Sequence, residues 1–340
     1  MRVRASVARM FRARIAFAFV LALAACGSKS PTPTTVPLPA DPVTAPVVAA
    51  RPADPVAPPA APEKPMPPLD LKIAAITPTA KLVSAGKGKK SVLTYAYKVG
   101  DKQPVEIALD FATTSKTLDG KDSDDTVLPT LVLTGSAETT AVAADGTATY
   151  QMTVATATGR DVPGAKVTAA QMQTVLAPTL PGTVLTGTVG KNGAPGAGAL
   201  HVEKPDQSTE QALELVKLTM PVWPVLPKEP VGDGAKWTVT TPAVLQDRIA
   251  ITYTTDYELV KRKGATWTVK GTTKVTGADQ EFPEGKISAV GGSGSFDASY
   301  ADGTVFPVTS QGLETLFTAS QGGDSLLLTF RSKSTISAPK

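Results

Sequence analysis

The segment LVLTGSAETTAVAADGTATYQMTVATA, residues 131–157, decides the fold class. Apolar and polar residues alternate through most of 131–142 and 148–157, a period of two that indicates strands with one buried face. Between them lies Ala144-Asp145-Gly146. Asp-Gly supplies the positive φ that a tight hairpin turn needs. The segment therefore predicts an antiparallel β-hairpin.

The same alternation recurs along most of the chain after residue 68. It predicts two more hairpins: 294–300 with 304–308 around Asp302-Gly303, and 249–261 with 266–276 around residues 262–265. Further strands are predicted at 92–98, 105–111, 183–189, 236–241, 286–290 and 326–336. Consecutive strands joined by short turns favour antiparallel pairing.

Two segments have the helical period instead. In the first, Ala165, Ala169, Met172 and Leu176 lie on one face, and Pro178 ends the pattern. The second runs from Ser208 to about Met220, with Ser208 and Gln211 in capping-box spacing. The predicted fold class is therefore α+β, mainly antiparallel β, with a curved sheet or half-barrel and two short helices packed on it.

The amino-terminal 25 residues are typical of an export signal. Five arginines and no acidic residue precede an apolar run of eleven residues, 15–25. That run is shorter than the roughly 20 residues that cross a bilayer as a helix. It fits the apolar segment of a secretory signal peptide.

The run ends in Leu23-Ala24-Ala25-Cys26, which resembles the lipobox of bacterial lipoproteins. The resemblance implies a diacylglyceryl thioether on Cys26, cleavage after Ala25 and acylation of the new amino terminus. Gly27 and Ser28 follow, without an aspartate, as in the class sorted to the outer membrane. The alternative is an ordinary signal peptide followed by a cysteine that happens to lie there. The expected location is the cell envelope, lipid-anchored, at the outer membrane and facing the periplasm.

Residues 27–68 contain 14 of the chain's 30 prolines and no aromatic residue. Proline removes backbone donors and fixes φ, so the segment predicts a semi-extended tether of at most about 130 Å. Three parts are thus expected: a signal peptide at 1–25, a lipidated and disordered tether at 26–68, and a β-rich globular domain at 69–340.

Charge and composition exclude several classes of function. Without the five arginines of the signal, 29 basic residues face 30 acidic residues, so a nucleic-acid partner is not expected. The chain has one cysteine and one histidine. An internal disulfide and most zinc sites are therefore excluded, and no cofactor is expected.

The stretch from Pro224 to Trp237 has the pattern Leu-Pro-x-x-Pro-Val-x-x-Gly-x-x-Trp. With residues 130–260 around it, the stretch resembles an uncharacterised family of bacterial envelope proteins. The resemblance implies an extracytoplasmic β-rich domain and no activity. From the residues alone, Trp237 is expected to start a strand and to lie in the core.

Searches for chemical motifs leave few candidates. Ser84-Ala-Gly-Lys87 has Ser-x-x-Lys spacing but no companion motif, so a basic, flexible loop is expected at 84–90. Asp119, Asp122, Asp124 and Asp125 form an acidic segment that is a weak candidate for calcium, and a solvated loop is the alternative. His201 is expected in a short strand without a metal. No pair of carboxylates is singled out for hydrolysis.

Three functions follow as hypotheses. The first is a non-enzymatic, lipid-anchored envelope protein that acts as an interaction or structural module, with an envelope protein or the cell wall as partner. The second is a carrier of a lipid or another apolar ligand on a concave β-face. The third is a cell-wall glycan hydrolase with two carboxylates in an open cleft.

Overall fold

The computed structural model describes residues 66–120, 122–206, 209–218, 222–245, 248–283 and 285–339. The predicted signal, Cys26 and the tether up to residue 65 lie outside the described residues. The strands and helices are β1 (Leu69–Ile73), β2 (Thr79–Ser84), β3 (Lys87–Ser91), β4 (Lys102–Thr117), β5 (Ser123–Val127), β6 (Thr130–Val142), β7 (Ala148–Arg160), α3 (Ala169–Leu176), β8 (Val184–Val189), β9 (Pro195–Val202), α4 (Thr209–Leu218), β10 (Val231–Asp233), β11 (Lys236–Leu245), β12 (Ile249–Lys263), β13 (Thr266–Thr276), β14 (Gln280–Phe282), β15 (Gly285–Tyr300), β16 (Val308–Gln321) and β17 (Asp324–Ser337).

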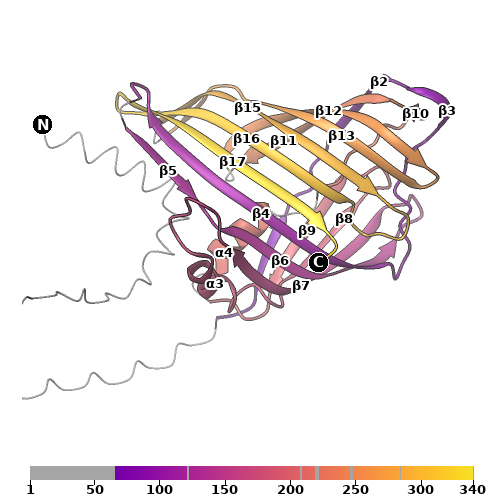
Figure 1. The fold of residues 1–340 in the computed structure, drawn as a ribbon, viewed down its shortest axis with the longest axis horizontal. Helices are drawn as coiled ribbons and strands as arrows, with labels where there is room; N and C mark the ends of the chain where they lie inside the picture. The colour runs from indigo at the N-terminus through magenta and orange to yellow at the C-terminus, as the bar shows by residue number, and fades with distance from the viewer. Residues whose placement is uncertain are drawn as a thin grey trace, which may run out of the picture.

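Fifteen of these strands form one large sheet (Figure 1). Its order is β1-β9-β8-β7-β6-β4-β17-β16-β15-β13-β12-β11-β2, with β5 paired to β4 and β14 paired to β15. The strands β3 and β10 form a separate two-stranded sheet. Neighbouring strands are antiparallel throughout, for example β6 with β7 and β12 with β13. The prediction of a mainly antiparallel β fold is confirmed.

The large sheet is strongly curled, as Figure 1 shows. Its two edge strands, β1 and β2, are consecutive in the chain and are joined only by residues 74–78. A link of that length spans at most about 20 Å. A flat sheet of thirteen strands would be roughly 55–60 Å wide, because neighbouring strands lie about 4.8 Å apart. The edges can therefore be joined only if the sheet bends back on itself.

Two of the three predicted hairpins have the predicted turns. In β6–β7, Gly146 has a φ of +86°, and the Asp145 carboxylate accepts a hydrogen bond from the Thr147 amide at 2.9 Å. The β12–β13 strands extend into the basic turn and leave only residues 264–265 between them. The third hairpin, β15–β16, also forms, but the prediction of a strand at 304–308 was wrong. Residues 301–307 are a loop, because Val305 and Phe306 turn inward and are buried.

The predicted strand at 92–98 is also wrong. Leu93, Tyr95 and Tyr97 are buried at alternate positions, which is the burial pattern of a strand, but the segment pairs with no strand. Instead it contributes these three side chains to the main core, and its backbone bonds to a loop through the Tyr95 amide and the Lys191 carbonyl, 2.8 Å apart. The alternation in the sequence correctly predicted which side chains of the segment are buried, but it wrongly predicted that the segment pairs with a strand.

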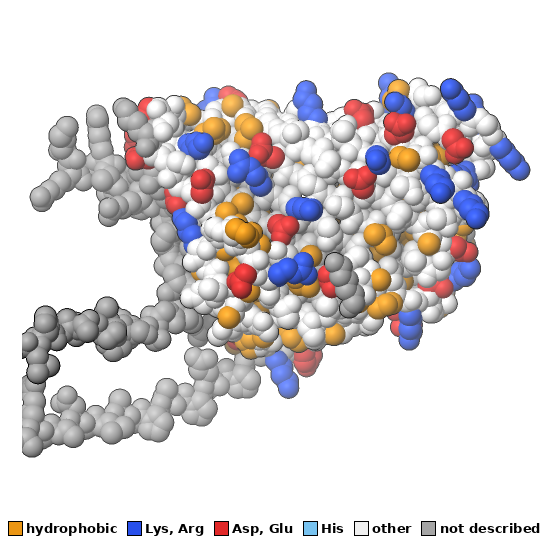
Figure 2. Space-filling view, viewed as in Figure 1, with side chains coloured by type: hydrophobic (Ala, Val, Ile, Leu, Met, Phe, Trp, Pro, Cys, Tyr) orange, Lys and Arg blue, Asp and Glu red, His pale blue; other side chains and the backbone are white. Residues whose placement is uncertain are grey.

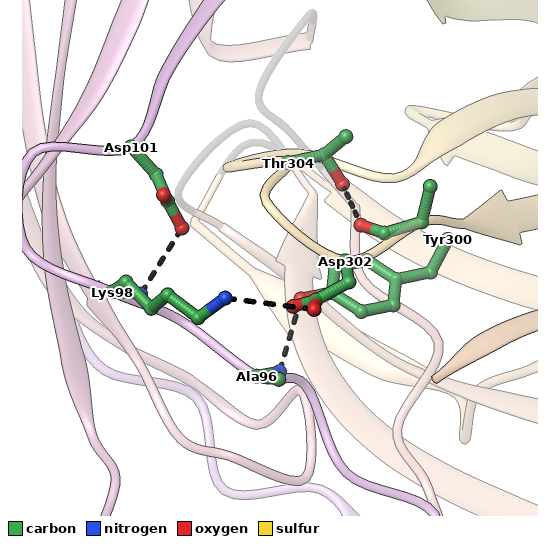
Figure 3. A network of polar contacts seen from close by, with 7 residues as sticks. Ala96, Lys98, Asp101, Tyr300, Asp302 and Thr304 are labelled. Atoms are coloured by element: carbon green, nitrogen blue, oxygen red, sulfur yellow. Dashed lines mark hydrogen bonds and ion pairs between the residues drawn. The ribbon is translucent and has the colours of Figure 1, made fainter. Parts of the chain in front are cut away.

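Polar contacts hold this interior segment in place (Figure 3). The Ala96 amide donates to the Tyr300 hydroxyl at 3.0 Å. The Lys98 amide donates to the Asp101 carboxylate at 3.1 Å, and the Lys98 ammonium lies 3.5 Å from the carboxylate of Asp302. The segment is thus fixed to the loop that follows β15.

Both helices form close to where they were predicted. Helix α3 begins at Ala169 rather than Ala165, because Thr168 and Gln171 form a capping box. The Thr168 hydroxyl accepts from the Gln171 amide at 3.1 Å, and the Gln171 side chain accepts from the Thr168 amide at 2.8 Å. This helix packs against β7. Helix α4 buries Ala212, Leu213 and Val216, and its predicted cap, Ser208, lies outside the described residues.

The main core combines side chains from both halves of the curled sheet with the interior segment and the helices. Aromatic rings fill much of it. The ring of Tyr95 lies 5.2 Å from Trp267, 4.8 Å from Tyr300 and 5.6 Å from Tyr97. Burial raises the pKa of Tyr95 well above its usual value. Its hydroxyl therefore stays protonated and donates to the Pro224 carbonyl at 3.0 Å.

A second, smaller apolar cluster lies on strands β12, β13 and β15–β17. Its eight core members are each at most 9% exposed, and partly buried side chains such as Leu313 and Phe330 border it. Each of these strands has one end near the β12–β13 turn, and the cluster lies toward the opposite end, as the positions of Ile251 and Val275 show. The inward face is therefore apolar at both ends.

Candidate docking surface

The basic segment at 87–91 forms the strand β3 and not the expected flexible loop. It pairs with β10, which places Lys87 opposite Asp233 and Ser91 opposite Val231. A turn with a φ of +72° at Gly86 leads into it, and a side chain at Gly86 would come within 2.4 Å of the Gly232 carbonyl oxygen. All five residues of β3 are exposed. The segment is ordered as a strand because it pairs with β10, which is distant in the sequence.

A second basic triplet, Lys261-Arg262-Lys263, lies at the tip of the β12–β13 hairpin. The Arg262 guanidinium donates to the carbonyls of Ser91 at 3.2 Å and Val92 at 3.4 Å. It thereby attaches the hairpin tip to the end of β3, about 170 residues earlier in the chain. The two triplets, which the sequence separates widely, lie side by side.

We call these six residues the basic end: Lys87, Lys89, Lys90, Lys261, Arg262 and Lys263. The segments 83–92, 231–233 and 260–264 around it carry one acidic residue, Asp233. Elsewhere on the surface, several lysines pair with acids, as Lys236 does with Glu258 at 3.5 Å. Within the described part of the chain, none of the five lysines of the basic end has an ion pair. Figure 2 shows several Lys and Arg side chains, with some Asp and Glu side chains among them, where Figure 1 places β3 and β10.

Three exposed valines lie close to these basic residues in the sequence. Val83, at the end of β2, is 65% exposed, Val92 is 45% exposed, and Val260 is 48% exposed. The β12–β13 register shifts between Leu259 and Lys261, so Val260 is the extra residue of a β-bulge. We call Val83, Val92 and Val260 the valine trio. Exposed aliphatic side chains beside unpaired cations are a surface that can bind.

From sequence, residues 84–90 are expected as a flexible loop and residues 262–265 as a hairpin turn. Their meeting depends on the pairing of β3 with β10 and on the Arg262 clamp. The signal that could have found them is the repeated arrangement of a valine, a glycine and three basic residues within a few positions, in 83–92 and again in 260–264.

The acidic candidates for calcium are spread along the turn before β5 and along β5 itself. The carboxylate of Asp119 accepts from the Thr117 hydroxyl at 2.6 Å, and the Asp124 carboxylate pairs with the Lys166 ammonium. Asp124 and Asp125 are neighbours on one strand, so their side chains point to opposite faces. Over the described residues, no group of three or more His, Cys, Asp or Glu side chains could hold a metal. The calcium site stays a prediction from sequence.

The inward positions of the long strands lack acidic residues. We take these positions from the alternating burial of β4, β12, β13, β15, β16 and β17. These positions carry glycine or side chains that are aliphatic, aromatic, hydroxyl-bearing or amide-bearing. On β12 they are Ile249, Ile251, Tyr253, Thr255, Tyr257 and Leu259. On these six strands the concave face therefore presents no pair of carboxylates for glycoside hydrolysis.

His201 lies on β9, where the short strand was predicted, directly opposite Asp70 of β1. Its Nδ1 is 2.8 Å from the Asp70 carboxylate, and its Nε2 is 3.1 Å from the Glu203 carboxylate. The two hydrogen bonds raise the pKa of His201 above its usual value, and the bond to Asp70 is the larger cause. Through the contact with Asp70, the ring links the edge strand β1 to β9.

We expect this link to be visible in a pH titration. Because the pKa of the folded state is raised, the stabilisation is complete below the unfolded-state pKa of about 6.5 and is lost as the pH rises through the folded-state value. The ring signals of this single histidine, followed by NMR, should titrate above pH 6.5. Asp70→Asn should lower the midpoint more than Glu203→Gln does. A wild-type midpoint at or below 6.5 would contradict the linkage.

No helix among the described residues is long and apolar enough to cross a membrane. Comparison with known proteins finds no matching family model and no matching curated protein. One similar solved structure is OmpT, in-vitro folded and in trimer form, an outer membrane protein of Vibrio cholerae. The two are 9% identical over 69% of this chain and 99% of that chain, with a TM-score of 0.15. At that score the likeness carries no argument about fold or function.

Proposed function

We propose that this chain is a non-enzymatic, lipid-anchored protein of the cell envelope that docks on an anionic surface through its basic end. The observation that carries the proposal is the meeting of two basic triplets at one end of the β fold, where, among the described residues, no acid forms an ion pair with their lysines. These lysines retain their attraction for a partner, because none of them forms an ion pair with a carboxylate of the described residues.

The anchor and the location rest on the sequence. The order of basic region, apolar run and Cys26 supports lipidation, and Gly27-Ser28 supports the outer membrane. The proline-rich segment then supplies up to about 130 Å of reach. An anchored domain on such a tether can contact the membrane that holds it or a surface opposite.

We also propose a finer description of the fold as a half-barrel covered by two short helices. The short link between the edge strands supports it, as does the packing of α3 on β7. An interior filled by aromatic rings favours docking over the carrying of a ligand. A carried lipid would have to displace side chains of the second cluster, whose eight core members are at most 9% exposed. Catalysis by paired acids has no candidates on the six long strands.

The proposal predicts site-specific binding of a polyanion. The probe is inorganic polyphosphate, and the protein is the full chain without its export signal, carrying Cys26→Ser so that no acyl group contributes. Changing Lys87, Lys89, Lys90, Lys261 and Lys263 to glutamine should weaken binding at least tenfold. Arg262 is kept because it holds the hairpin to β3.

A matched control separates the site from net charge. Lys72, Lys116, Lys270, Lys274 and Lys333 lie on strands of the large sheet. Changing these five to glutamine removes the same charge and should alter polyphosphate binding less than twofold. Equal weakening by the two sets, measured by calorimetry at one salt concentration, would show that binding follows net charge and would end the proposal.

A further inference from the structure

The basic end carries a further inference about its partner, which rests on the proposed function. We propose that it docks on the surface of an anionic phospholipid bilayer, with the valine trio entering the headgroup region and the cations contacting lipid phosphates. The same cations could meet phosphate on a soluble polymer, but three features of the basic end serve no purpose in binding a polymer.

The first such feature is the exposed valine trio. A hydrated polyanion gains nothing from aliphatic side chains, and leaving them in water is unfavourable. A bilayer interface accepts both aliphatic side chains and cations, which is the combination that interfacial segments use. Val83, Val92 and Val260 are 45–65% exposed, and each lies within five residues of a lysine of the basic end.

The second feature is the way in which the surface is built. The valine at 260 is exposed by a β-bulge, and the one at 92 has its carbonyl held by Arg262. The turn before β3 is held against β10 by a hydrogen bond of 2.9 Å from the Gly232 amide to the Ala85 carbonyl. These contacts fix the backbone that carries the apolar and charged side chains before any partner arrives, which lowers the entropic cost of binding.

The third feature is shape. The two-stranded sheet β3–β10 and the tip of the β12–β13 hairpin form a projecting corner of the molecule, as Figure 1 shows. A projecting surface suits a flat and extended partner, whereas a groove suits a single polymer chain. Cations next to such a surface attract anionic headgroups and lose that attraction as salt screens it.

The test uses the full chain without its export signal and with Cys26→Ser, mixed with vesicles. Vesicles of phosphatidylcholine with 30% phosphatidylglycerol, the fraction we choose for the assay, are compared with vesicles of phosphatidylcholine alone. We expect at least tenfold stronger flotation with the anionic vesicles and a loss of binding at high salt. Val83, Val92 and Val260 changed together to threonine should weaken vesicle binding several-fold and leave polyphosphate binding unchanged.

Insertion is measured with an environment-sensitive dye on a new cysteine. Val92→Cys, in the Cys26→Ser background, should show a blue shift and an increase in fluorescence with anionic vesicles. Val244→Cys is the matched control, because Val244 is 58% exposed and pairs with Ala250, about ten residues along β12 from the basic end. Its dye should stay in water.

The outcomes separate the two proposals. Binding to polyphosphate without binding to anionic vesicles would overturn the bilayer proposal and leave docking on an anionic surface in place, with a polymer as partner. Vesicle binding with no response at position 92 would also overturn it, since the valines would then have no role. Binding to neither probe would overturn both proposals.

Discussion

Trp237→Ala is expected to lower the free energy of unfolding by about 3–5 kcal/mol, the range for removing a large buried aromatic side chain. Trp237 is fully buried at the start of β11. Its indole N–H donates to the Val225 carbonyl at 2.8 Å, and its ring stacks on Tyr257 at 5.6 Å. Alanine removes the packing and leaves that carbonyl unpaired inside the protein, so the loss should fall in the upper part of the range.

Chemical denaturation of the purified chain measures this loss, and Trp237→Phe serves as its partner variant. Phenylalanine keeps an aromatic ring over Tyr257 and loses the hydrogen bond and part of the volume. A cost of about 1–3 kcal/mol is expected for it. If Trp237→Ala lowered the free energy of unfolding no more than Trp237→Phe does, the ring of Trp237 would not be stabilising the connection from Val225 to β11 by packing.

The sequence predicted Trp237 as a core residue because a large apolar side chain followed a proline-rich, extended connection. It predicted the β6–β7 hairpin for a similar reason, since both the alternation and the Asp145-Gly146 turn are local. Local signals of this kind also located α3 and most of the long strands. Where a pattern depends on neighbours in the chain, the sequence alone is sufficient.

Two predictions failed where the partner of a segment was distant in the chain, and the strand at 304–308 failed because Val305 and Phe306 turn into the core. The segment 92–98 has the alternation of a strand, but it packs on the main core without a partner strand, and its backbone amides donate to Lys191 and Tyr300. The segment 87–91 has the lysines and glycine of a loop, but β10 pairs with it. Burial can be predicted from the side chains, whereas pairing depends on which backbone lies alongside.

The candidate docking surface shows the same limit. Each basic triplet is visible in the sequence, and the near-neutral net charge argued against a nucleic-acid partner. Net charge does not describe how charges are distributed over the surface. Most acidic residues lie away from the basic end, and many of them form ion pairs, such as Glu314 with Arg331 at 2.7 Å. A contact between residue 262 and residues 91–92 has no local signature.

Gln103→Met is expected to cost about 2–4 kcal/mol for a different reason, the loss of two buried hydrogen bonds. Gln103, in β4, is 9% exposed, and its amide serves both backbone groups of Phe306. The Phe306 amide donates to the Gln103 carbonyl oxygen at 2.8 Å, and the Gln103 Nε2 donates to the Phe306 carbonyl at 3.2 Å. Methionine has a similar length, so the change tests hydrogen bonding more than packing.

Gln311→Met is the matched control. Gln311 lies at a partly buried inward position of β16, and no other described group forms a hydrogen bond with its side chain. Its replacement should cost less than about 1 kcal/mol, as for a change of similar volume. In Gln103→Met, exchange of the Phe306 amide hydrogen should also accelerate at least tenfold, because its acceptor is gone. Equal costs for the two variants, or an unchanged exchange rate, would contradict the argument that Gln103 holds the 301–307 loop against β4.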